Sequence, residues 1–224
     1  MTDFPFAMVG FDLDGTLVDS NLDLTPAVNH ALSRAGRPTI PLEAVRKLIG
    51  GGALRMLERA IELTGDPVPT IELEQLHEEL LQHYEAHIAD NTRPFPGCLD
   101  ALDRLAGHGC RLAVVTNKVE RNAVKLVEAL GIADRFSCVI GGDTLGPGRA
   151  KPAPDMIEEA IRRCGGEGRF AMVGDSSYDT RAARAAGVPV VALSFGYNDV
   201  PVDALDCDAL IDHYDELVPA LAGL

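Results

Sequence analysis

Short runs of consecutive apolar residues recur along the chain, and segments with helical spacing separate them. The runs do not alternate between apolar and polar positions, which is typical of strands buried on both faces of a parallel sheet. They occupy residues 7–11, 111–116, 137–142, 170–175 and 189–193, with a weaker run at 208–213. Strands that alternate with helices predict an α/β fold built on a doubly wound, mostly parallel sheet.

The segment that follows the first expected strand breaks this alternation. Its helical spacing predicts four consecutive helices without intervening strands, at residues 25–36, 41–50, 53–65 and 70–90. Thr25 is the expected N-cap of the first, with Pro26 at the first helical position, where the missing N–H has no cost. The sequence therefore predicts a helical insert between the first strand and the rest of the sheet.

This insert divides the expected structure into two domains. The α/β catalytic core is predicted to comprise residues 1–18 and 96–224, and the helical cap domain residues 19–95. We expect the chain to cross between them near 18–22 and again near 92–97, where the proline-containing segment TRPFPG begins the return.

The net charge of the chain makes some classes of binding partner improbable. The 224 residues carry a formal net charge of −14, and 46% of them are hydrophobic, as in an ordinary globular protein. Binding to nucleic acid or to an anionic membrane is not expected, because phosphate contacts require clustered Lys and Arg. A small phosphorylated metabolite remains a plausible partner if a metal ion or a few basic residues reverse the field locally.

The cysteines and the chain start favour a cytoplasmic protein. The five cysteines are odd in number and form no CxxC pair, so we expect reduced thiols. The first residues lack the basic and apolar pattern of a signal peptide, and no apolar stretch approaches 18 residues.

Polar side chains gather where the expected strands end. Asp12 and Asp14 follow the first strand, Thr116 and Asn117 follow the next, and Asp175, with Asp179 four residues later, follows the fourth. Each could simply cap the helix that comes next. Ligands of open α/β sheets bind outside the carboxyl ends of the strands, however, and several carboxylates there indicate a hard divalent cation. Mg²⁺ is the most plausible choice, since it prefers oxygen ligands and accompanies phosphate.

Lys151 lies in the segment RAKPAPD, just before an expected helix. A lysine is usually a solvated surface residue. A site that combines carboxylates with a phosphate needs a fixed positive charge, however, and a lysine ammonium supplies one with three donors.

Taken together, these segments resemble a known family. DLDGT (12–16), TN (116–117), Lys151 in KPAPD and GDSSYD (174–179) are similar, in this order, to the four motifs of the haloacid dehalogenase-like superfamily of phosphotransferases. The resemblance covers essentially the whole chain and implies a Rossmann-like core with an inserted helical cap domain. Within the superfamily, FDLDGTLVDS, VVTNK, GGDTL and KPAPD are most similar to the phosphoglycolate phosphatases.

The resemblance also implies roles for individual residues. Asp12 would be the nucleophile that forms an aspartyl-phosphate, and Asp14 the general acid and then the general base. Thr116 and the backbone amides near Asn117 would hold the phosphoryl oxygens, and Lys151 would neutralise their charge. The Mg²⁺ ligands would be the carboxylates of Asp12 and Asp175 and the backbone carbonyl of Asp14, with Asp179 as a ligand directly or through water.

One cap segment is a candidate for recognition of the leaving group. In IGGGALRM (49–56), the backbone of Gly51 and Gly52 could approach an anion at the start of a helix, with Arg55 nearby. A flexible turn between two cap helices explains the same glycines equally well.

These expectations define a Mg²⁺-dependent phosphomonoester hydrolase, with 2-phosphoglycolate as the first candidate substrate. The alternatives are a sugar-phosphate phosphatase, a β-phosphoglucomutase-like phosphomutase and an inorganic pyrophosphatase. A non-catalytic regulator that only binds phosphorylated ligands is a further alternative, although such a protein usually lacks one of the two first aspartates. Both a monomer and a homodimer are compatible with the sequence.

Overall fold

The computed structural model describes residues 4–224 and centres on a parallel sheet of six strands in the order β5-β4-β1-β6-β7-β8. All neighbouring strands in this sheet pair in parallel. Their bounds are β1 Met8–Phe11, β4 Arg111–Val115, β5 Cys138–Ile140, β6 Phe170–Gly174, β7 Val190–Leu193 and β8 Ala209–Ile211. The six strands expected from the apolar runs are therefore confirmed, each shorter than or equal to its run.

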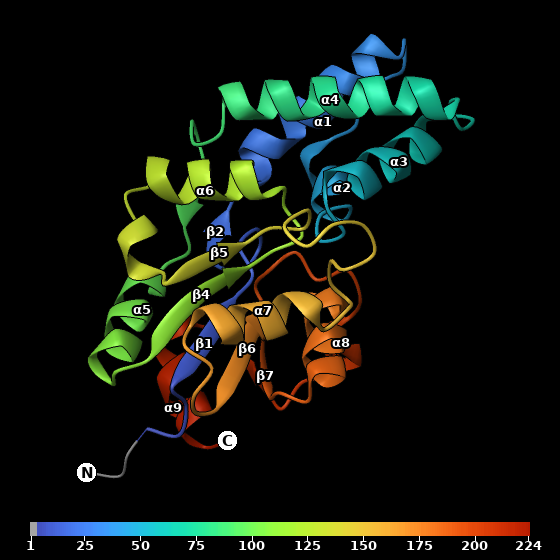
Figure 1. Ribbon diagram of the computed structural model, residues 1–224. Helices are drawn as coiled ribbons and strands as arrows, with labels where there is room; N and C mark the ends of the chain where they lie inside the picture. Colours follow the sequence, from blue (N-terminus) through green and yellow to red (C-terminus); the bar gives the residue numbers. More distant parts are fainter. Residues whose placement is uncertain (1–3) are drawn as a thin grey trace.

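Helices cover both faces of the sheet (Figure 1). On β1, Val9 and Phe11 pack in the core that α5, α6 and α9 share, whereas Met8 packs in the core that α7 covers. This division follows from the two-residue period of a strand. The helix bounds are α5 Cys98–Gly107, α6 Glu120–Ala129, α7 Asp155–Arg163, α8 Ser177–Ala186 and α9 Leu217–Ala222. The predicted doubly wound α/β core is thus confirmed.

Four further helices lie together at one end of the molecule, beyond the sheet (Figure 1). They pack on one another through contacts of α1 with α2, α3 and α4. Their bounds are α1 Asn21–Arg34, α2 Leu42–Arg46, α3 Ala53–Thr64 and α4 Thr70–Ala86. They correspond to the expected helical cap, and we retain the domain boundaries at 18/19 and 95/96 as a proposal.

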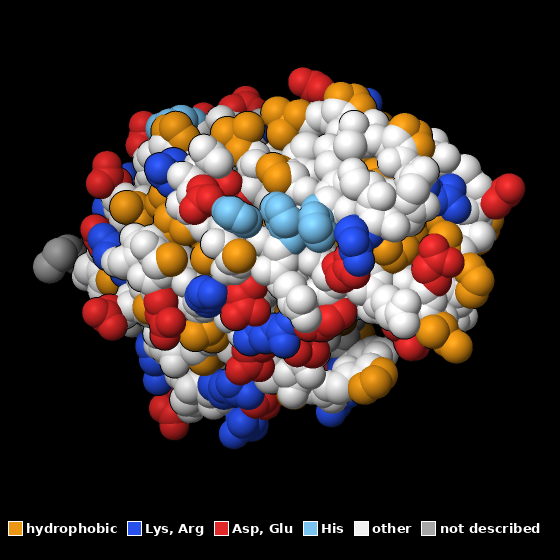
Figure 2. All heavy atoms as spheres, turned by 90° about the horizontal axis from the view of Figure 1, so that it is seen from above, with side chains coloured by type: hydrophobic (Ala, Val, Ile, Leu, Met, Phe, Trp, Pro, Cys, Tyr) orange, Lys and Arg blue, Asp and Glu red, His pale blue; other side chains and the backbone are white. Residues whose placement is uncertain are grey.

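The outer face of this cap carries charges of both signs, with histidine side chains gathered near its middle (Figure 2). The ring of His83 in α4 stacks on His30 of α1 at 4.7 Å and lies 5.0 Å from the ring of His87. These contacts add to the packing between α1 and α4. No helix among the described residues combines the length and apolarity that a membrane crossing requires.

The start of α1 differs from the prediction. The helix begins at Asn21, so Pro26 lies inside it and Thr25 is not its N-cap. The backbone N–H groups of Ser20 and Asn21 donate to the hydroxyl of Tyr197, from the loop after β7. The prediction was wrong because this partner of the helix start lies far away in sequence.

Helix α2 is also shorter than predicted, because it ends at Arg46 rather than at residue 50. The chain turns after it, and Gly50 and Gly52 adopt φ values of 119° and 87°. Such positive φ values are incompatible with a continuing right-handed helix.

The two chain segments that connect the cap with the core pair with each other. Strands β2 Val18–Asp19 and β3 Arg93–Pro94 form a short antiparallel pair there. Beside it, the buried carboxylate of Asp23 accepts hydrogen bonds of 2.7–3.0 Å from backbone and side-chain groups of Asn91 and Thr92. Burial alone would raise the pKa of Asp23, but these hydrogen bonds hold it below its ordinary value.

We predict that Asp23→Asn lowers the free energy of unfolding by about 1–3 kcal/mol, because the amide replaces one acceptor and leaves buried donors unpaired. Urea denaturation measures the change, with Asp66→Asn on the exposed surface as the control. Because the folded pKa of Asp23 is depressed, its contribution is complete above the unfolded pKa of about 3.9. The contribution disappears as the pH falls through the folded pKa. Equal stability of the two variants near pH 7 would contradict the role of Asp23.

Candidate active site

Three adjacent strands bring the predicted site residues together. Strand β1 lies between β4 and β6, and all three end at the same edge because they are parallel. Asp12 and Asp14 follow β1, Thr116 follows β4, and Asp175 follows β6. Asp179 lies in the first turn of α8, directly after β6. The carboxyl edge of the sheet therefore collects these side chains as the sequence predicted.

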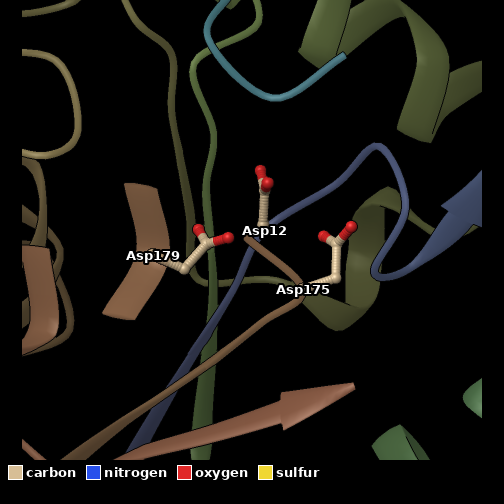
Figure 3. Close-up of side chains that lie close together, drawn as sticks. All are labelled: Asp12, Asp175 and Asp179. Carbon is tan, nitrogen blue, oxygen red and sulfur yellow. The ribbon is translucent and has the colours of Figure 1, made fainter. Parts of the chain in front are cut away.

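Three of these carboxylates form one buried cluster. One oxygen each of Asp12, Asp175 and Asp179 lies within 4.8 Å of the others, and all three residues are buried (Figure 3). Asp175 is fixed by Thr16, whose hydroxyl donates to it at 2.7 Å, and by the backbone N–H of Tyr197 at 2.7 Å. The side chain of Asp14 is not part of the cluster.

Lys151 reaches the same cluster from the loop before α7. Its buried ammonium lies 3.1 Å from Asp12 Oδ1 and 2.6 Å from Asp179 Oδ1, and it donates to the carbonyl of Val115 at 2.7 Å. Burial alone would lower the pKa of Lys151, but the two carboxylates raise it above its ordinary value. Lys151 is therefore a fixed positive charge of the site and not a solvated surface lysine.

The cluster still lacks positive charge. Burial raises the pKa of Asp12 above its ordinary value although Lys151 opposes the shift, and burial with the neighbouring Asp179 and Asp12 charges raises the pKa of Asp175. Three carboxylates and one ammonium leave two negative charges, which a divalent cation would balance. The donors are all oxygens, as a hard cation prefers. These residues therefore fit a divalent metal ion.

Asp14 lies on a tight turn beside the cluster. Gly15 adopts a φ of 84°, and a Cβ there would lie 2.5 Å from Asp175 Oδ2, so glycine alone fits. The turn directs the Asp14 side chain away from the other carboxylates. Its Oδ1 accepts a hydrogen bond of 2.5 Å from the Ser20 hydroxyl, and its Oδ2 lies 2.7 Å from the ammonium of Lys118. Asp12 and Asp14 thus have different environments although both follow β1. Such a difference is required if one carboxylate is to act as a nucleophile and the other as an acid and base.

The residues after β4 form the side of the site that faces the cap. Thr116 is buried and lines a pocket together with Asp12 and Asp14. The side-chain amide of Asn117 donates to the carbonyls of Gly50 and Lys151, both at 3.0 Å. Asn117 therefore ties the cap to the core beside the carboxylates.

The structure does not bring the whole predicted cap segment to this pocket. Gly52 lines it, but Gly51 and Arg55 do not. Arg55 is about half exposed and pairs with Glu58 one helical turn away, at 3.0 Å. The close approach that Gly52 allows is to the core backbone, because a Cβ there would lie 3.0 Å from the carbonyl of Asn117.

Three polar residues of the pocket were missed in the sequence analysis, among them Asn122 of α6. Lys118 directly follows the expected Thr116–Asn117 pair, but nothing local connects it with Asp14, 104 residues earlier. Tyr84 occupies a buried position of α4, where an aromatic residue is normally taken for cap core. Only the packing of the cap on the sheet edge reveals that these residues line the site.

Comparisons with known proteins agree with this geometry. A family model described as haloacid dehalogenase-like hydrolase matches residues 9–193. The chain is 40% identical over 223 residues to a phosphoglycolate phosphatase of Agrobacterium fabrum, covering 99% of this chain and 95% of the relative.

Solved structures are similar over nearly the full length. A predicted phosphoglycolate phosphatase from Haemophilus somnus superposes with a TM-score of 0.88 at 30% identity, covering 96% of this chain and 97% of that one. A CbbY mutant from Rhodobacter sphaeroides in complex with xylulose-(1,5)-bisphosphate gives a TM-score of 0.80 at 25% identity, covering 96% and 99%.

The strand-end carboxylates, the buried lysine and the helical cap occur here in one chain that matches the family over most of its length. The chain therefore belongs to the haloacid dehalogenase-like hydrolase family and is a phosphatase.

Proposed function

We propose that this phosphatase hydrolyses 2-phosphoglycolate in a Mg²⁺-dependent reaction that passes through an aspartyl-phosphate on Asp12. The buried cluster of Asp12, Asp175 and Asp179 around Lys151, with Asp14 held outside it, is the observation that carries the proposal. The substrate is supported by the relative named phosphoglycolate phosphatase, which is 40% identical over 223 residues.

Three of the proposed metal ligands are the carboxylates of the buried cluster, which lie within 4.8 Å of one another. The carboxylates of Asp12, Asp175 and Asp179 and the backbone carbonyl of Asp14 would hold Mg²⁺. When bound, the ion would offset negative charge on the phosphoryl oxygens, a main contribution in phosphoryl transfer. Lys151 and the Thr116 hydroxyl would hold those oxygens from the protein side.

Two half-reactions account for hydrolysis. A carboxylate oxygen of Asp12 bonds to phosphorus while the bond from phosphorus to the ester oxygen breaks, and Asp14 gives its proton to the leaving glycolate oxygen. Asp14 then takes a proton from water, whose oxygen bonds to phosphorus as the bond to Asp12 breaks. Inorganic phosphate leaves, Asp12 is a free carboxylate again and Asp14 carries its proton again.

A sugar-phosphate phosphatase is the second candidate, because the CbbY structure to which this chain is similar holds a sugar bisphosphate. The pocket beside Asp14 weighs against it. Apolar side chains such as Leu24, Ile49 and Met56 form much of its lining and offer a sugar few partners for its hydroxyls. Such a pocket favours a short leaving group over a hydroxyl-rich sugar.

A panel of phosphate esters tests the proposed activity. With Mg²⁺ we expect the largest kcat/KM for 2-phosphoglycolate, and little phosphate release from sugar phosphates or pyrophosphate. Removal of metal with a chelator should abolish release, and added Mg²⁺ should restore it. A preference for sugar phosphates would keep the chemistry and reject the substrate, whereas full activity without a divalent cation would reject the metal assignment.

Asp12→Asn should reduce phosphate release by at least ~10³-fold, because the amide keeps the shape of the side chain and loses the nucleophilic charge. Thermal unfolding monitors the fold of this variant. Since the substitution relieves charge repulsion in the cluster, its Tm without metal should not fall. Retained turnover would exclude Asp12 as the nucleophile.

Asp14→Asn should lower the rate on 2-phosphoglycolate by about 10²–10⁴-fold, as expected when a general acid and base is lost. With p-nitrophenyl phosphate, whose leaving group needs no proton, we expect a burst of one nitrophenolate per site and then slow turnover. Rapid-mixing absorbance measures the burst. An unchanged steady-state rate on 2-phosphoglycolate would remove Asp14 from the mechanism.

A further inference from the structure

The pocket beside Asp14 lies between cap and core, where the leaving group of a phosphate ester would lie. Asp14 must meet the ester oxygen to protonate it, so the rest of the leaving group extends into this pocket. Core and cap both contribute to its lining, which includes Asp14, Lys118 and Asn122 of the core and Leu24, Met56 and Tyr84 of the cap.

Lys118 is the cation among these lining residues. Its side chain is 7% exposed, its ammonium lies 2.7 Å from Asp14 Oδ2, and it sits 4.4 Å from the centre of the Tyr84 ring. The Asp14 carboxylate beside it and the face of the Tyr84 ring both favour the charged ammonium. The pocket therefore offers a fixed positive charge at its polar end.

Three buried side-chain oxygens of residues that line this pocket have no hydrogen-bond partner within residues 4–224. One is Oδ1 of Asn117, whose NH₂ group already joins cap and core. The other two are the hydroxyl of Tyr84, whose residue is 2% exposed, and Oδ1 of Asn122, whose residue is 1% exposed. A buried polar group without a hydrogen bond is unfavourable, so these groups are suited to pair with polar atoms of a molecule that enters the pocket. Burial raises the pKa of Tyr84 to about 12, so its hydroxyl remains a donor. The Asn122 amide can turn to present its NH₂ group.

From these groups we infer that Lys118, Tyr84 and Asn122 bind a carboxylate on the leaving group, so that the enzyme selects phosphate esters of short hydroxy acids over neutral esters. The inference rests on the proposed phosphatase reaction and identifies the side chains that recognise the leaving group of the substrate. It assigns carboxylate recognition to these three side chains instead of to Gly51 and Arg55, which do not line the pocket.

The spacing suits a two-carbon acid. Lys118 contacts one oxygen of Asp14, and the ester oxygen of the substrate has to contact Asp14 as well. In glycolate the carboxylate carbon is only the second carbon from that ester oxygen. A substrate carboxylate can therefore pair with Lys118 while the ester oxygen remains at Asp14. The apolar side chains of Leu24, Met56 and Leu80 surround the methylene group and offer a sugar no partners for its hydroxyls.

The test compares two esters that differ in the carboxylate. Wild-type, Lys118→Met and Tyr84→Phe enzymes are assayed with 2-phosphoglycolate and with ethyl phosphate, in saturating Mg²⁺. Lys118→Met should lose roughly 10- to 100-fold in kcat/KM on 2-phosphoglycolate, the effect of one charge-assisted hydrogen bond, and no more than about threefold on ethyl phosphate. Tyr84→Phe should show a smaller loss in the same direction.

Two controls separate recognition from general damage. Lys125→Met removes an exposed charge from α6, the helix that follows Lys118, and should leave both rates unchanged. Tyr84→Phe removes a hydroxyl that has no hydrogen-bond partner among the described residues, so its Tm should not fall. Glycolate should raise the Tm of the wild type but not that of Lys118→Met, and ethylene glycol should raise neither.

The outcomes distinguish this inference from the proposed function. Equal losses on both esters in Lys118→Met would assign Lys118 to holding Asp14 and overturn the inference, while hydrolysis of 2-phosphoglycolate by the wild type would stand. Wild-type enzyme that releases no phosphate from either ester, yet is stabilised by glycolate only when Lys118 is present, would reject the proposed reaction and keep the carboxylate site.

Discussion

The structure depends on one electrostatic constraint, the burial of three carboxylates around a single ammonium. Asp12, Asp175 and Asp179 would repel one another strongly without compensating charge. Lys151 supplies one positive charge from within the fold, and the remaining imbalance is what makes the cluster suited to a divalent cation. The sheet makes this arrangement possible, because three adjacent parallel strands and the helix after β6 present their polar residues at one edge.

Tyr197 connects the carboxylate cluster with the cap. Its backbone N–H holds Asp175, and its hydroxyl accepts hydrogen bonds from the start of α1 and contacts Asp19 at 2.8 Å. The preceding residue, Gly196, passes so close that a Cβ there would lie 2.3 Å from that of Asp175. The loop after β7 therefore positions both a carboxylate of the cluster and the first helix of the cap. The geometry of the site thus depends on the core and on the cap.

The sequence was informative wherever the determining interaction is local. Continuous apolar runs such as residues 111–116 predicted the buried strands, and the polar residues after them predicted which side chains meet at the sheet edge. The start of α1 was mispredicted because Tyr197 accepts its N–H groups from across the fold. Lys118 was overlooked for a similar reason, since its partner Asp14 is remote in sequence and a lysine is usually solvated.

The roles of the cap residues were the hardest to predict from the sequence. Helical spacing predicted that Tyr84 is buried in α4, but spacing cannot tell a core position from one that faces a pocket shared with another domain. The glycines at 50–52 likewise fitted both an anion site and a turn. The structure shows Gly50 and Gly52 at the contact with Asn117.

The measurement that tests the central claim most directly is chemical trapping of the covalent intermediate. The Asp14→Asn variant would be mixed with p-nitrophenyl phosphate and Mg²⁺, because this ester forms the intermediate without a proton from Asp14. The acyl phosphate would then be reduced with borohydride, which converts the phosphorylated aspartate to homoserine. Mass spectrometry of the peptides would then locate the change. The account predicts homoserine at position 12 and at no other aspartate. Phosphate release without any modified Asp12, or modification of another residue, would contradict it.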